Sequence, residues 1–164
     1  MINKCLVLTA VFIAVHTSAW PQNPKNGTAG RALPELLERA LSQVRAKTTV
    51  PILLPARLPS GIKEAEIQHV DIDATSYGYR ISLAYEGGTG DGFAGYFGAQ
   101  RGTDSHPLGE EVMLAKNVSG FFLPGVFPTL DWELNGVLYT FQFREIGKAD
   151  MIASANSAIL AGAR

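Results

Sequence analysis

Cysteine and histidine are both scarce in this sequence, which has one cysteine, Cys5, and three histidines among 164 residues. A disulfide within the chain needs two cysteines, and the usual cysteine-based zinc sites also need at least two. The single cysteine excludes both within one copy of the chain. The fold must therefore be held together by its apolar core.

An excess of charge of one sign is also missing. The chain has 14 basic and 15 acidic residues, and no basic block stands out. Proteins that bind nucleic acid or anionic membrane surfaces usually carry a concentrated positive patch. We therefore expect no nucleic-acid partner and no electrostatic attraction to a membrane surface.

Residues 1–19 have the pattern of a cleaved secretory signal peptide. Lys4 gives a positive start, an apolar run extends from Cys5 to Val15, and small residues occupy positions 17 and 19. We expect cleavage after Ala19 and a periplasmic or secreted location. The run is shorter than the about 20 residues that a membrane span needs. An uncleaved anchor, or a buried helix of the fold, is the alternative interpretation.

Cleavage would remove Cys5 and leave the mature chain without any thiol chemistry. Lys4 stands where a lipidation signal needs a small residue, so we expect no stable membrane anchor after cleavage. Residues 20–31 are rich in Pro, Asn and Gly and predict a flexible leader. Residues 32–164 then form a single domain, whose length suffices to bury about two-thirds of its unfolded surface.

Two helices are predicted from apolar residues spaced three and four apart. The first extends from Leu33 to near Lys47, with Pro34 in its first turn. The second extends from about Lys148 to Ala161. Its apolar stripe comprises Met151, Ile152, Ala155, Ala158 and Ile159.

Strands are predicted between these helices, and the clearest signal is the hairpin at 129–144. Asn135-Gly136 is the preferred two-residue turn because both positions need positive φ. This turn pairs Trp132 with Tyr139 on one face and Asp131 with Thr140 on the other. Further strands are expected at 66–74, 77–86, 93–100 and 111–116, with a Gly-rich turn at 87–92 and an edge strand or extended arm at 51–55. Residues 119–127 follow as an apolar segment interrupted by Gly and Pro.

These elements predict an α+β fold. Short connections and repeated hairpins favour antiparallel pairing over βαβ units. We expect a curved, mostly antiparallel sheet of five to seven strands, with the N-terminal and the C-terminal helix packed on one face.

Cofactor and metal motifs are weak. Residues 90–95 match the glycine spacing of a dinucleotide loop, but a strand follows where that loop needs a helix. Asp71 and Asp73 lack the glycine and glutamate of a calcium loop. His69 and His106 have no close ligand spacing. We therefore expect no cofactor and no metal.

No catalytic constellation is evident, and the catalytic residues are unknown. The chain has no G-x-S-x-G elbow. A secreted hydrolase with a dispersed site that uses His69 or His106 stays open as an alternative function.

Residues 121–127 are unusually apolar for a connection. One interpretation is a buried strand followed by a turn. The other is an exposed apolar contact for a partner or lipid, made by Phe121, Phe122 and Phe127.

The C-terminal third resembles the DUF4367-like extracytoplasmic domain of bacterial lipoproteins and anti-sigma factors. The resemblance rests on Trp132, Gly136 and Tyr139 in a hairpin, then a helix with Ala155 and Ser157. It implies no established activity, and this chain lacks the lipidated cysteine and the sigma-binding part found in such proteins. We predict an exported, soluble binding or accessory domain of the bacterial cell envelope, whose partner is an unknown protein or envelope ligand.

Overall fold

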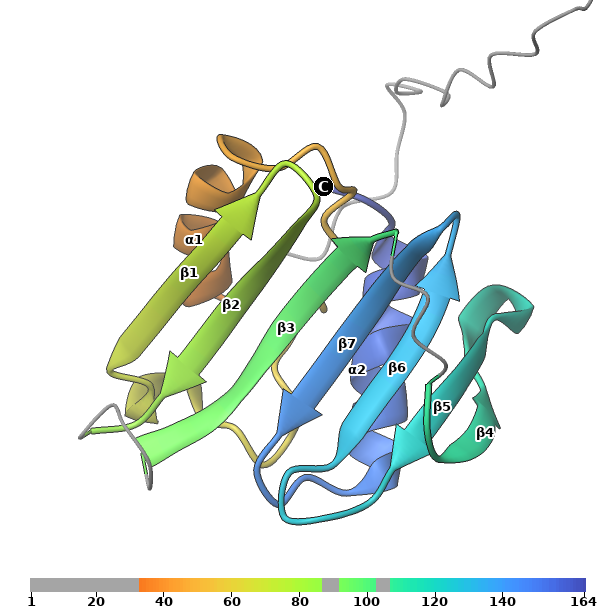
Figure 1. Ribbon diagram of the computed structural model, residues 1–164. Helices are drawn as coiled ribbons and strands as arrows, with labels where there is room; N and C mark the ends of the chain where they lie inside the picture. Colours follow the sequence, from red (N-terminus) through yellow and green to blue (C-terminus); the bar gives the residue numbers. More distant parts are fainter. Residues whose placement is uncertain (1–32, 87–91, 103–106) are drawn as a thin grey trace, which may run out of the picture.

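The computed structural model describes residues 33–86, 92–102 and 107–164 (Figure 1). The predicted α+β fold is confirmed, since seven antiparallel strands form one sheet in the order β1-β2-β3-β7-β6-β5-β4. Both helices lie behind this sheet, on the same face (Figure 1). The elements are α1 Glu35–Arg45, β1 His69–Thr75, β2 Gly78–Ala84, β3 Phe93–Arg101, β4 Glu110–Met113, β5 Ser119–Leu123, β6 Thr129–Leu134, β7 Val137–Phe143 and α2 Lys148–Ala161, with short 3-10 turns at Glu64–Glu66 and Ala115–Asn117.

The two helices bury the stripes that their sequences predict, with small differences. Helix α1 begins at Glu35, because Pro34 has the extended ψ of 138° and serves as the N-cap. Helix α2 has the predicted bounds, and Met151 and Ala155 are fully buried. Ser154 is buried in α2 while Ile152 is only partly buried, so the stripe is rotated slightly from the predicted one.

The predicted hairpin is confirmed in turn and in register. Asn135 and Gly136 have φ of 55° and 71°, as a type I′ turn requires. Trp132 lies opposite Tyr139, and their stacked rings are 5.5 Å apart between centroids. Strands β6 and β7 therefore bring their apolar side chains to the helix-covered face, where Phe97, Phe141 and Phe143 complete the aromatic core.

Two segments differ from the expected strands. Residues 51–55 are the extended arm and not an edge strand, and Tyr79 holds this arm by accepting from the Leu53 N–H and donating to its carbonyl. Strand β1 begins only at His69, and Glu66, where the strand is expected to begin, is the last residue of a 3-10 turn. Most of the predicted 87–92 turn lies outside the described residues.

A β-bulge lies in β3 beside Gly95. Leu83 pairs with Gly95, whereas Ala84 pairs with Phe93, so Ala94 is the extra residue. Gly95 has φ of +152°, and a Cβ there would collide with the Gln142 carbonyl oxygen. From Gly95 onward β3 pairs with β7 in regular register, and this pairing joins the two halves of the sheet.

Candidate functional site

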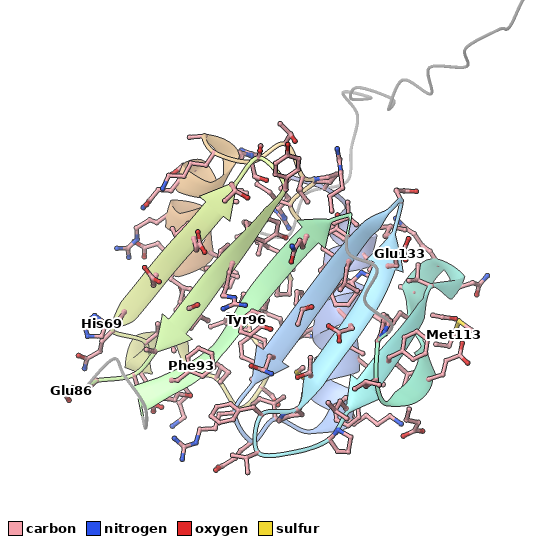
Figure 2. All side chains as sticks on the ribbon, in the orientation of Figure 1. His69, Glu86, Phe93, Tyr96, Met113 and Glu133 are labelled. Atoms are coloured by element: carbon pink, nitrogen blue, oxygen red, sulfur yellow. The ribbon has the colours of Figure 1, made fainter. Side chains whose placement is uncertain are left out.

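No described helix or strand lies over the face of the sheet that is turned away from the helices (Figure 1). Because side chains alternate along strands, every second residue of the sheet points to this helix-free face. Tyr96 lies near its centre, while His69, Glu133 and Met113 lie toward its margins (Figure 2). The helix-free face is therefore a surface on which the fold can present side chains to a ligand.

Arg80 of β2 and Tyr96 of β3 meet at the centre of this face. The Arg80 Cζ lies 4.6 Å from the centroid of the Tyr96 ring, which is a cation–π contact. Gly98 stands between Arg80 and Thr140 in the register of the three central strands. Because Gly98 has no side chain, the sheet surface is hollowed at this point, beside the Tyr96 ring.

A groove extends from this hollow toward β6 and β5. The part near Gly98 has a volume of about 90 Å³, and the part beyond Tyr96 has about 300 Å³. The two parts share Tyr96, Leu138 and Thr140 in their walls, so they lie next to each other, and we refer to them together as the groove. The larger part is also lined by Asp131, Thr129, Leu123, Pro107 and Leu108.

Asp131 places a partly buried carboxyl group in the wall of the groove. The Thr140 hydroxyl donates to the Asp131 Oδ1 at 2.6 Å. Burial raises the pKa of Asp131 above its ordinary value, and the hydrogen bond from Thr140 opposes this rise. Most of the acceptor capacity of the carboxylate stays unused by this single bond.

Several donors at the groove have no partner among the described residues. The Arg80 guanidinium makes only its contact with the Tyr96 ring, and the Tyr96 hydroxyl and the Gln100 amide make no hydrogen bond there. The pKa of the Tyr96 hydroxyl is raised, mainly by burial. The positive charge of Arg80 lowers this pKa and the negative charge of Asp131 raises it. The hydroxyl therefore stays protonated at neutral pH. The groove thus offers both donors and acceptors to a ligand.

The three phenylalanines that the sequence proposes as a partner contact do not share one surface. Phe122 is 7% exposed and belongs to the core, because it points to the helix side of β5. Phe121 is partly buried on the helix-free face, opposite Asp131. Phe127 is exposed in the turn after β5 and packs on Phe93, with ring centroids 5.7 Å apart. Only Phe121 and Phe127 are accessible to a partner.

His69 is exposed at the start of the edge strand β1, near the rim of the helix-free face (Figure 2). Its side chain makes no hydrogen bond with other described residues, so no serine or carboxylate among them is hydrogen-bonded to it. His106 lies outside the described residues. Within the described ranges, no three potential metal ligands are grouped together.

Of the residues that line this groove, the sequence predicts one cross-strand pair, and it does not predict the others. The turn at Asn135-Gly136 already placed Asp131 opposite Thr140. Tyr96 and Arg80 were not singled out, although the alternation of β2 and β3 places both opposite the buried face. Their meeting with Asp131 depends on the pairing of β3 with β7, for which the sequence contains no local signal.

Comparisons of the chain with protein-family models, with curated proteins and with solved structures found no match. Among the described helices, none has the length and hydropathy needed to cross a membrane. The role of the helix-free face therefore rests on the residues of this chain alone.

Proposed function

We propose that this protein is an exported, soluble binding or accessory domain of the bacterial cell envelope. It binds an envelope ligand or a protein partner in the groove on its helix-free face. The observation that carries this proposal is the groove at Tyr96, in which donors without a partner among the described residues lie beside a partly buried carboxyl group.

The energetics of Asp131 support a binding role. A carboxyl group whose pKa is raised by burial is less stable in its charged form than it would be in water. Such groups concentrate at functional sites, where a ligand recovers the lost solvation. A ligand with hydrogen-bond donors for Asp131 and acceptors for Arg80 and Tyr96 fits this arrangement.

The proposed export rests on the sequence of residues 1–19. A positive start, a short apolar run and small residues before the expected cleavage site are typical of secretory signals. The intact mass of the exported protein tests this part, because a chain that begins at Trp20 is expected and one that begins at Met1 contradicts it.

A photo-crosslinking amino acid at position 96 tests the binding face in living cells. We expect p-benzoylphenylalanine in place of Tyr96 to yield a specific crosslinked product in the envelope fraction. The same group at Gln43, exposed on α1, serves as the matched control and is expected to give none of this product. Equal products at the two positions would contradict the proposal, as would substrate turnover that is lost in His69→Ala or His106→Ala.

A further inference from the structure

Three arginines converge on a second hollow, away from the helix-free face. This hollow has a volume of about 440 Å³ and forms where the segment after α1, the end of β3 and the C-terminal segment meet. Arg45, Arg101 and Arg164 line it together with Thr48 and Thr49. No acidic side chain is among its lining residues.

Three separate elements bring these arginines together. Arg45 is the last residue of α1, and Arg101 is the last residue of β3. The main-chain N–H of Arg164 donates to the Ile52 carbonyl at 3.0 Å, which fixes the C-terminal segment beside the extended arm. Arg101 also lies near enough to the Tyr139 hydroxyl to lower its pKa, although burial raises that pKa to about 12.

The three guanidinium groups have no anionic partner in the described chain. The ion pairs within 4.0 Å there involve other basic side chains, as in the pair between Arg39 and Glu35. The Nε of Arg164 is buried and has no hydrogen-bond partner among the described residues. A buried donor left in this state is costly, and like charges gathered in one hollow repel each other. An anion in the hollow would relieve the repulsion between the arginines.

The hydroxyl of Thr48 adds a neutral donor to this set. Its Oγ1 accepts from the Val50 N–H at 3.2 Å, which leaves its own proton available. The Thr49 hydroxyl already donates to the Ser76 carbonyl and is not available. Arginine forks match the paired oxygens of phosphate groups, and a hydroxyl often completes such a site.

We propose that the hollow lined by Arg45, Arg101 and Arg164 is a binding site for a phosphate group. The group could be carried by inorganic phosphate or by a phosphate ester, because both present the same oxygens. This site is separate from the groove at Tyr96, and either could exist without the other.

Titration of the full chain with inorganic phosphate, at ionic strength held constant with chloride, tests this site. We expect saturable amide shifts around Ile52, Arg101 and Arg164. Arg101→Gln and Arg164→Gln should each weaken binding at least about tenfold, since each removes a charge-assisted hydrogen bond. Arg39→Gln removes the same charge elsewhere on the surface and should bind phosphate as the unmodified chain does. Shifts that never saturate, or equal weakening in the control, would overturn the proposal.

A second measurement on the unmodified chain avoids any dependence on the folding of variants. Phenylglyoxal modifies accessible arginines, and peptide mass analysis locates each modified residue. Phosphate is expected to protect Arg45, Arg101 and Arg164 but not Arg39 or Arg57. Protection by a phosphomonoester at lower concentration than by inorganic phosphate would assign the site to an ester, and the reverse order would assign it to the free anion. Equal modification of all five arginines with and without phosphate would contradict the site.

Discussion

The two faces of the central sheet are built from alternating residues of the same strands, yet they differ in burial and in polarity. On the covered face, Leu130, Trp132 and Phe141 are fully excluded from water. On the helix-free face, their neighbours Asp131 and Thr140 are only partly buried and bear polar groups. The comparison shows that adjacent residues of one strand lie in different surroundings. Under the proposed function, those on the covered face contribute to stability and those on the helix-free face to binding. Changes on the two faces should therefore have separable effects.

The largest difference in the free energy of unfolding is expected between alanine substitutions of two aromatic residues, one on each face. Trp132→Ala removes a fully buried side chain and should lower the free energy of unfolding by about 3–5 kcal/mol. Tyr96→Ala on the helix-free face should lower it by less than about 1 kcal/mol while abolishing crosslinking to ligand from neighbouring positions. Urea denaturation measures both. Equal losses of stability in the two variants would contradict the division between the faces.

Two glycines of β3 allow the same comparison with a smaller change, the addition of one methyl group. Gly95→Ala places a Cβ against the Gln142 carbonyl at a φ of +152°, so it should cost about 1–3 kcal/mol. A Cβ at Gly98 would instead lie 3.2 Å from the edge of the Tyr96 ring, which can shift toward solvent. Gly98→Ala should therefore change stability by within about 0.5 kcal/mol and weaken binding in the groove. If Gly98→Ala proved the more damaging to stability, the groove would be part of the core.

The hydroxyl of Tyr139 connects the covered face to the extended arm. It donates to the Pro51 carbonyl at 3.0 Å. Tyr139→Phe keeps the ring and removes this bond, so a loss of about 0.5–1.5 kcal/mol is expected in thermal or urea unfolding. Tyr77→Phe, at a side chain that is 70% exposed, is the matched control and should leave stability unchanged. An equal effect in both variants would show that the bond to Pro51 contributes nothing.

The smallest effect on the free energy of unfolding is expected at Asp131. Unlike the substitutions above, a substitution there should stabilise the folded chain. Because the folded-state pKa is raised above 3.8, protonated Asp131 favours the folded chain. This stabilisation is complete below that ordinary value and is lost as the pH rises through the folded-state pKa. Asp131→Asn keeps an acceptor for Thr140 and cannot ionise.

Asp131→Asn should therefore be more stable than the unmodified chain at pH 7, by up to about 0.5 kcal/mol, and the gain should vanish near pH 3. Urea midpoints at the two pH values measure it. A loss of stability at pH 7 would show that the charged carboxylate is favoured in the fold, contrary to its raised pKa.

The covered face could be predicted from the sequence because its signals are local. The Asn135-Gly136 turn specifies which residues of β6 and β7 face each other, and the helical spacing marks the buried side of α1. Pairings between distant strands leave no such signal. Tyr96 and Asp131 meet only because β3 pairs with β7, and Arg45, Arg101 and Arg164 meet only through the path of the extended arm and the C-terminal segment.

The most direct measurement of the role of the helix-free face is an amide spectrum of the isotope-labelled chain, recorded with and without an envelope extract of its host. We expect chemical-shift changes clustered on Tyr96, Gly98, Asp131 and Thr140, and their loss in Tyr96→Ala. Changes confined to the outer surfaces of α1 and α2, with the groove unaffected, would contradict a binding role for this face.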